Sequence, residues 1–294
     1  MRELDALMRD YDGVVPGASV LVVRDGRAVV KRAYGFANLE EQVQATSATN
    51  YRLASVTKQF TAAAVLSLNI DLDRPVFGAN TIRHLLTHTS GVMDYEDLIP
   101  AGTTGQLRDA DVLRLLESQD RVYFAPGTNY RYSNSGYALL ALIVERESGM
   151  EFGAFLRETI FKPLGMDNTG VSNVTNRAYG YTGSQRTDQS LTSAVLGDGG
   201  VYSSIDDLEK WDAALYDDRF AEMFVPRTKT DDPDTQYGYG WRITGDSVWH
   251  SGESIGFRNV IVRYPKRRLT IVVLTNRNDP EPYPKALQVA EMFS

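Results

Sequence analysis

The order of the predicted elements constrains this chain most, because strands stand at both ends and helices fill the middle. Residues 17–23 and 27–34 are rich in valine and flank an Asp-Gly pair, which is typical of a tight hairpin turn. Residues 257–264 and 269–274 predict two more strands, and the second is apolar enough to be buried on both faces. We therefore expect one antiparallel sheet built from both chain ends, with a helical insertion between them.

Helical patterns occupy most of the intervening chain and its last residues. Their expected ranges are 55–68, 81–87, 109–118, 135–147, 152–160, 204–216 and 283–293. Ser204 is expected to cap the sixth helix, because acidic residues follow it where the helix dipole favours them. The fold class is therefore α+β. We expect residues 1–60 and 195–294 to form the sheet domain and residues 61–194 to form a mostly helical domain.

Composition excludes several classes of protein. The 294 residues carry a net charge of -7, which argues against a nucleic-acid partner. No apolar run approaches the roughly 20 residues of a membrane span. The absence of cysteine excludes disulfides, thiolate zinc sites and cysteine nucleophiles. The first residues do not resemble a signal peptide, so the compartment stays open: periplasmic or secreted if a leader was removed, and cytoplasmic otherwise.

A Ser-x-x-Lys motif, Ser55 to Lys58, stands at the start of the first central helix. A spacing of three residues places both side chains on one helical face, so the amine can take the proton that makes a serine hydroxyl nucleophilic. Backbone N–H groups at a helix start can also stabilise an oxyanion. The motif is weak by itself, since about one match is expected by chance in a chain of this size.

Two further motifs strengthen this interpretation. Tyr132-Ser133-Asn134 offers a phenol for proton transfer and an amide that can hold a substrate or the lysine. His250-Ser251-Gly252 ends one predicted strand, where a small residue allows a substrate to lie along the strand edge.

These three motifs, in this order and at this separation, resemble the penicillin-binding protein and serine β-lactamase superfamily. The nearest branch contains class C β-lactamases, D-Ala-D-Ala carboxypeptidases, D-aminopeptidases and family VIII esterases. Residues 85–91, 126–127 and 199–204 form further short motifs that support the resemblance. The resemblance extends from about Gly17 to Asn276. It implies a β-lactamase-like fold with the active site at the junction of the two domains.

The resemblance also implies roles for individual residues. Ser55 attacks a carbonyl and is acylated, while Lys58 and Tyr132 move the serine proton to the leaving group. Asn134 orients the lysine and the substrate. The backbone N–H groups of Ser55 and Glu253 form the oxyanion hole, and water activated by Tyr132 releases the acyl group. His250, Ser251 and Gly252 are expected to contact the substrate.

Two departures from the family pattern stand out. His250 replaces the lysine of the usual Lys-Thr-Gly, and a histidine is mostly neutral at pH 7, so we expect weak or absent β-lactamase activity. Esterase and peptidase branches do carry histidine there. The loops after Leu68 and Arg219 are also shorter than is usual in the family.

The predicted function is a serine hydrolase that acts through an acyl-enzyme on a small ester or amide. Short esters, D-amino-acid peptides and β-lactams stay open as substrates, and so does the oligomeric state. The alternative is a binding or sensor domain for β-lactams or peptidoglycan fragments that is acylated without turnover. We expect no cofactor and no metal.

Two other patterns receive structural interpretations. Ser254 lies in a Gly-x-Ser-x-Gly, but all three histidines precede it and a strand follows it, unlike the α/β-hydrolase nucleophile. His84 and His88 have the i, i+4 spacing of zinc ligands, yet the chain lacks the Glu of His-Glu-x-x-His, so we expect packed or hydrogen-bonded histidines.

Overall fold

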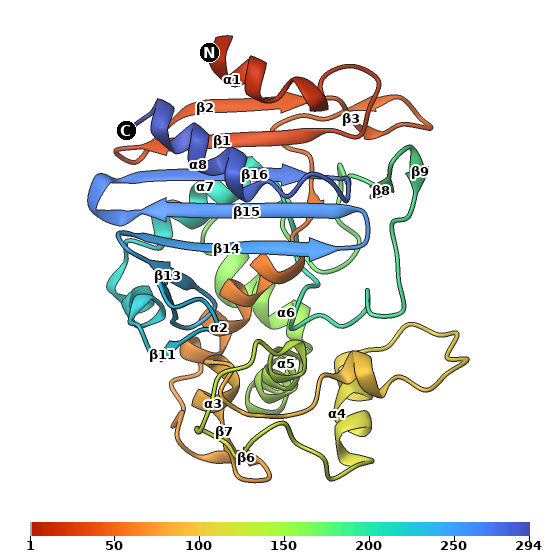
Figure 1. Cartoon of the computed structure of the whole chain (residues 1–294), viewed down its shortest axis with the longest axis vertical. Helices are drawn as coiled ribbons and strands as arrows, with labels where there is room; N and C mark the ends of the chain where they lie inside the picture. The colour runs from red at the N-terminus through yellow and green to blue at the C-terminus, as the bar shows by residue number, and fades with distance from the viewer. Residues whose placement is uncertain (1) are drawn as a thin grey trace.

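An eight-stranded sheet with the order β11-β12-β13-β14-β15-β16-β1-β2 lies at one end of the molecule (Figure 1). The computed structural model describes residues 2–294. The strands of this sheet are β1 (Ala18–Arg24), β2 (Arg27–Tyr34), β11 (Thr228–Lys229), β12 (Thr235–Tyr237), β13 (Arg242–Thr244), β14 (Ser247–Ser254), β15 (Phe257–Tyr264) and β16 (Leu269–Thr275). All neighbours are antiparallel, and β16 pairs with β1. The predicted sheet from both chain ends is therefore confirmed.

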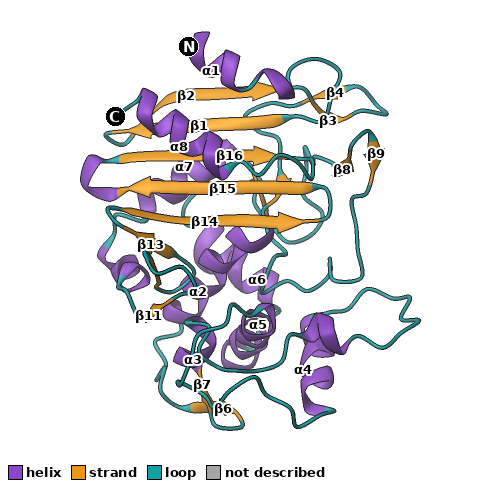
Figure 2. Cartoon of the chain, viewed as in Figure 1, coloured by secondary structure: helices purple, strands orange, loops and turns teal. Residues whose placement is uncertain are grey.

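Helices lie on both faces of this sheet and in a separate group beside it (Figure 2). The helices are α1 (Arg2–Leu7), α2 (Lys58–Ser67), α3 (Ile82–Leu86), α4 (Asp109–Glu117), α5 (Asn134–Ser148), α6 (Phe152–Leu156), α7 (Ile205–Ala214) and α8 (Tyr283–Met292). Short paired strands are β3 (Phe36–Asn38), β4 (Val43–Gln44), β5 (Tyr51–Arg52), β6 (Pro75–Phe77), β7 (Asn80–Thr81), β8 (Tyr181–Thr182), β9 (Gln185–Arg186) and β10 (Tyr202–Ser203).

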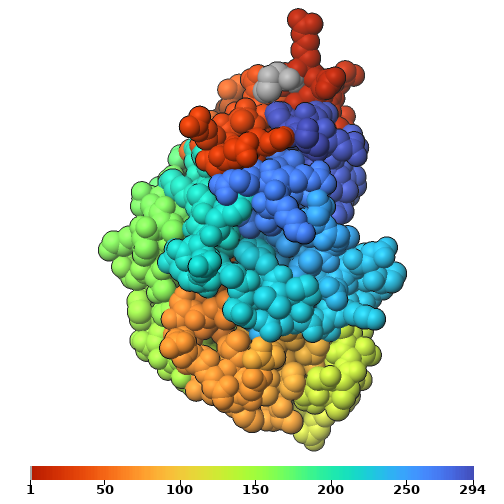
Figure 3. Space-filling model, turned by 90° about the vertical axis from the view of Figure 1, so that its left-hand side faces the viewer, coloured from red at the N-terminus to blue at the C-terminus, as the bar shows by residue number. Residues whose placement is uncertain are grey.

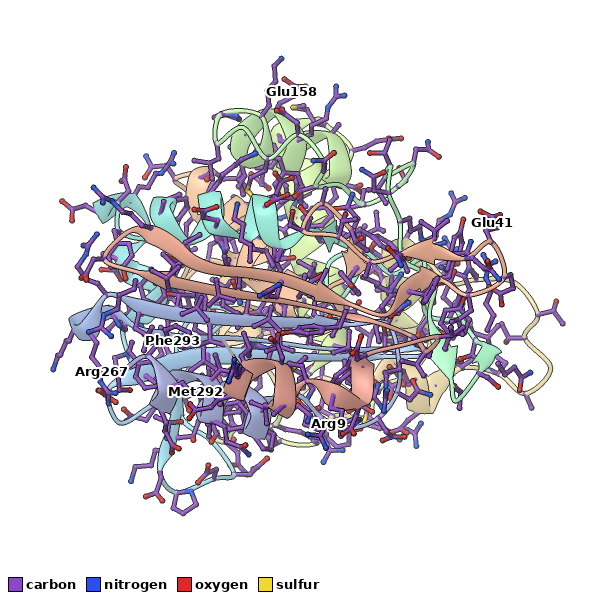
Figure 4. The ribbon with its side chains drawn as sticks, turned by 90° about the horizontal axis from the view of Figure 1, so that it is seen from above. Arg9, Glu41, Glu158, Arg267, Met292 and Phe293 are labelled. Atoms are coloured by element: carbon purple, nitrogen blue, oxygen red, sulfur yellow. The ribbon has the colours of Figure 1, made fainter. Side chains whose placement is uncertain are left out.

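Every residue of β16 is buried, because the strand separates two apolar cores. Ile271 and Val273 pack with α1 and α8, whereas Val272 and Leu274 belong to the core shared with α7 and the helical group. Seen from above, Met292 at the end of α8 lies on one side of the sheet, and Glu158 of the helical group lies on the other (Figure 4). Alternating side chains of one strand therefore join both layers to the sheet.

The helical group is centred on α2 and α5, which contact each other. Residues 58–65 of α2 are all buried, and α5 ends at Gly149, whose left-handed φ of 71° terminates the helix. In the space-filling view the segment coloured orange packs directly beneath the cyan and blue C-terminal half (Figure 3). The predicted division at residues 60 and 195 stays a prediction. No helix within residues 2–294 is long and apolar enough to cross a membrane.

Two predicted helices are more irregular than expected. Ser55 does not lie in the first turn of an α-helix: residues Ala54–Thr57 form a short 3-10 helix, η2, and α2 begins at Lys58. The helix expected over 152–160 changes to π-helix at residues Arg157–Phe161. Strand β14 also continues to Ser254, beyond the His250-Ser251-Gly252 motif at which the predicted strand ends. Sequence periodicity does not distinguish these tight or wide turns from a regular α-helix.

Candidate active site

Ser55 lies on η2, between strand β5 and helix α2. The preceding residue, Ala54, has a φ of 50°, in the left-handed region that residues with a Cβ adopt only at a cost. Strand β14 passes directly behind this turn. A Cβ added to Gly252 would lie 2.1 Å from the carbonyl oxygen of Leu53 and 3.2 Å from the backbone nitrogen of Ser55. Only glycine therefore allows β14 to approach the Ser55 turn this closely.

This contact gives a prediction for Gly252→Ala. Because the added methyl meets backbone, β14 must move away from Ser55, and a displacement of roughly 1 Å at a reacting centre costs about 100-fold in rate. We expect such a fall in kcat/KM for an activated ester. Gly105→Ala is the matched control, since open space surrounds a Cβ there and φ is not positive. Wild-type activity in Gly252→Ala would show that β14 does not fix the site.

Lys58 is completely buried, and its ammonium has three acceptors. Nζ donates to Ser55 Oγ at 3.0 Å, to Asn134 Oδ1 at 2.8 Å and to the Asp198 carbonyl oxygen at 2.9 Å. These bonds occupy all three donors of the group, so the amine is held in one position. Asn134 is the first residue of α5, whose N-cap Ser133 accepts a hydrogen bond from the N–H of Gly136. The cap thus anchors the turn that presents Asn134.

The ring of Tyr132 packs over the ammonium group of Lys58. Nζ of Lys58 lies 4.9 Å from the centre of the Tyr132 ring, and the guanidinium carbon of Arg242 lies 5.4 Å from it. Behind the phenol, the His88 ring packs at 4.4 Å between centroids. His88 Nδ1 accepts a hydrogen bond from the N–H of Ser133 at 3.0 Å. The Tyr132-Ser133-Asn134 motif therefore lies beside the Ser55 turn, and His88 packs against the other side of Tyr132.

His250 is buried behind the site rather than in its open part. Its Nδ1 is 2.7 Å from the Ser251 carbonyl oxygen, which can only accept, so Nδ1 carries the proton and Nε2 accepts from the Tyr237 hydroxyl at 3.0 Å. Burial, with help from Arg242 and Lys58, lowers the pKa of His250 well below its usual value. The histidine is therefore neutral and supplies no cation for a substrate carboxylate.

A cavity of about 510 Å³ opens above Ser55. Its lining includes Ser55, Tyr132, Asn134 and Glu253 from the predicted site. It also includes Arg52, Ala54, Tyr95, Glu96, Ser190, Thr192, Ser193, Asp198, Gly199, Ser254, Ile255, Arg258 and Asn278. Strand β13 pairs with β14 only as far as Trp249, so residues 250–254 of β14 have no strand partner on that side among the described residues. A substrate strand can pair along this edge.

Sequence reasoning did not identify four charged residues near the nucleophile: Arg52, Glu96, Asp198 and Arg242. The carboxyl group of Asp198 is buried, accepts a hydrogen bond from Tyr95 Oη at 3.1 Å, and has its pKa raised to about 6 by burial, against the effects of Lys58 and Arg52. Asp198 immediately precedes Gly199-Gly200, and Arg52 precedes Ser55 by three residues. In the sequence, the signal that pointed to Asp198 and Arg52 was their position next to these motifs.

The two histidines, His84 and His88, and the Gly-x-Ser-x-Gly segment take part in the packing and hydrogen bonding of the fold. His84 Nδ1 accepts a hydrogen bond from the N–H of Thr81 at the start of α3, while His88 belongs to the support beneath Tyr132. Ser254 ends β14 and is followed by strand β15. Among residues 2–294, no three metal-ligating side chains of His, Asp or Glu come together.

A profile of the family described as Beta-lactamase matches residues 4–291. The chain belongs to this family. Among members of similar sequence, it is 30% identical to penicillin-binding protein 4* of Bacillus subtilis, over 92% of this chain and 70% of that protein. It is 29% identical to a D-aminopeptidase of Gluconobacter oxydans, over 89% of this chain but only 56% of that enzyme. The chain thus spans little more than half the length of that relative.

The Beta-lactamase family member also matches the crystal structure of a penicillin-binding protein from Bacillus halodurans, with a TM-score of 0.84, 28% identity and 99% coverage of both chains. The predicted family, the β-lactamase-like fold and the serine hydrolase class are therefore confirmed. The roles of the individual residues stay predictions.

Proposed function

We propose that this chain hydrolyses small amides of D-amino acids through an acyl-enzyme on Ser55. The observation that carries the proposal is the 3.0 Å contact between Lys58 Nζ and Ser55 Oγ at the floor of a 510 Å³ cavity. The predicted nucleophile and its proton acceptor are already at hydrogen-bond distance, and Tyr132 lies over the same amine. D-aminopeptidases among the relatives support amides as the substrate class.

The first step requires that the Lys58 ammonium has given up one proton, so that Nζ keeps its hydrogen bonds to Asn134 and Asp198 and accepts from the Ser55 hydroxyl. Ser55 Oγ then attacks the substrate carbonyl carbon, and its proton passes to this amine. The carbonyl oxygen becomes an oxyanion, for which the backbone N–H groups of Ser55 and Glu253 are the donors. As the C–N bond breaks, the proton moves from Lys58, by way of the Tyr132 hydroxyl, to the leaving amine. Water then attacks the ester on Ser55, and the water proton passes to Tyr132 as the Tyr132 hydroxyl proton passes to Lys58. Lys58 returns a proton to Ser55 Oγ as the acid product leaves.

Asn134 has a double task in this scheme. Its Oδ1 accepts from Lys58 at 2.8 Å, which leaves its NH₂ group able to donate to the amide oxygen of a substrate. The carboxylates of Glu96 and Asp198 line the same cavity. These negative charges attract the ammonium group of a substrate whose amine is free. We therefore expect such a substrate to bind better than its N-acylated form.

A substrate panel tests the proposal. We expect the D-alanine p-nitroanilide to be hydrolysed, and its N-acetyl derivative to be poorer by about tenfold in kcat/KM, because the acyl group removes the ammonium. Nitrocefin should be a weak substrate, because neutral His250 stands where a lysine binds the β-lactam carboxylate in other family members.

Two outcomes of this panel contradict the proposal. One is a kcat/KM for nitrocefin that approaches the diffusional ceiling of about 10⁸ M⁻¹s⁻¹. The other is a stable adduct on Ser55 with penicillin, detected by intact-mass spectrometry, without turnover of any amide or ester, which identifies the chain as a sensor.

A further inference from the structure

The buried guanidinium of Arg52 is engaged by no carboxylate or carbonyl group of the described part of the chain. The residue is only 4% exposed, lies in strand β5 and lines the active-site cavity. Within residues 2–294 its guanidinium has no ion pair, and its Nε is buried without a hydrogen-bond partner. Burying such a group without an acceptor costs free energy, and the cost is larger for a charged group than for a neutral one.

The second arginine of the cavity shows the contrast. Arg258 donates through Nη1 to the carbonyl oxygens of Ser254 and Phe257, each at 2.9 Å, and through Nη2 to Glu253 Oε1 at 2.6 Å. Its charge is therefore already used within the β14–β15 hairpin. Arg52 instead contacts an aromatic ring, with its guanidinium carbon 5.8 Å from the centroid of Tyr202.

A second unpartnered donor lines the same cavity. The hydroxyl of Ser254, the last residue of β14, is buried and makes no hydrogen bond to the described part of the chain. Asp198 is the carboxyl group whose charge Arg52 influences, but the two form no ion pair within 4 Å, and the pKa of Asp198 stays raised. The acid therefore does not occupy the fork of donors that Arg52 presents.

We propose that Arg52 and Ser254 form a subsite for a carboxylate of the substrate. A planar guanidinium matches a carboxylate through two parallel hydrogen bonds, and a serine hydroxyl adds a third donor. The neutral His250 cannot supply this charge, whereas Arg52, three residues before Ser55, can. Resting on the proposed function, the subsite defines its substrates as short peptides with a free carboxylate rather than simple amino-acid amides.

The test compares D-alanylglycine with D-alanylglycinamide, which differ only in that carboxylate. Binding to the Ser55→Ala protein is measured by calorimetry, so that it does not depend on turnover. We expect the acid to bind about tenfold more tightly than the amide, and Arg52→Gln in the same background to remove about tenfold of affinity for the acid with much less effect on the amide. Ser254→Ala should remove about threefold, again for the acid.

Arg157→Gln is the matched control, because its side chain is 71% exposed on the helical group. Arg52→Lys, which keeps the charge without the fork, should fall between wild type and Arg52→Gln. Equal losses for acid and amide in both Arg52→Gln and Ser254→Ala, or no preference for the acid, overturn the subsite.

Turnover of the same two peptides is measured with the enzyme that retains Ser55. This measurement separates the carboxylate subsite from the proposed function. Hydrolysis of the amide without any preference for the acid overturns the subsite and leaves the proposed function standing. Arg52-dependent binding of the acid without hydrolysis of either peptide supports the subsite and contradicts the proposed function.

Discussion

Replacement of Ser55 by alanine is expected to reduce kcat/KM for any ester or amide substrate by about 10⁴- to 10⁶-fold. The hydroxyl is the atom that receives the acyl group, so its loss removes the covalent pathway. Only the oxyanion donors and the binding of the substrate persist, and they act on direct attack by water. Because Ser55 lies on the cavity surface and alanine retains the Cβ, we expect no loss of folding stability beyond about 0.5 kcal/mol.

Initial rates with p-nitrophenyl acetate and with D-alanine p-nitroanilide measure this effect, and a fluorophosphonate probe followed by intact-mass spectrometry reports the site of acylation. Ser67→Ala is the control, since this exposed serine on α2 donates only to the Ala63 carbonyl oxygen. Wild-type hydrolysis by Ser55→Ala, or a probe adduct that persists in it, would place the nucleophile elsewhere and remove the basis of the mechanism.

The sequence predicted the sheet well because its signals are local. Strand β15 has the bounds expected for it, 257–264, and β16 exceeds its range by one residue, since alternation and a valine-rich run depend on neighbours in the chain. The backbone around Ser55 could not be predicted in the same way. The left-handed Ala54 occurs where β14 packs against η2, which is a contact between residues about 200 positions apart.

The candidate site shows the same limit. Ser55, Tyr132 and Asn134 were recognisable because each belongs to a short motif, and the structure brings them together with Lys58. Arg52 and Asp198 belong to no such motif. The importance of both residues depends on their burial in a common cavity, and that of Arg52 also on the hydrogen-bond partner that its Nε lacks. Neither property is visible before the chain is folded.

His250, the first residue of the third motif, shows how the fold determines the charge state of a side chain. From its ordinary pKa alone, a histidine at position 250 is mostly neutral at pH 7, with a minor charged fraction. Burial, Arg242 and Lys58 lower that pKa, and the Ser251 carbonyl with the Tyr237 hydroxyl fixes one neutral tautomer. The motif therefore supports the strand beside Ser55 and leaves recognition of an anion to another group, for which Arg52 is the proposed residue.

Lys58→Met is expected to lower kcat/KM by about 10³-fold or more, because methionine fills a similar volume but cannot take the proton of Ser55. The same substitution leaves Asn134 Oδ1 and the Asp198 carbonyl oxygen without their donor, so we also expect a loss of stability of about 1–3 kcal/mol. Kinetics at a temperature well below the unfolding midpoint separate the two effects.

Lys285→Met provides the matched control for this substitution. Its ammonium is also largely buried, at 15% side-chain exposure, and donates to the Leu7 carbonyl oxygen far from the site, so it should lose stability without losing activity per folded molecule. The rate at which a fluorophosphonate labels Ser55 is the decisive measurement, since it requires the nucleophile but no leaving amine. Labelling of Lys58→Met at the wild-type rate would mean that another group activates Ser55, and the 3.0 Å contact would then be structural only.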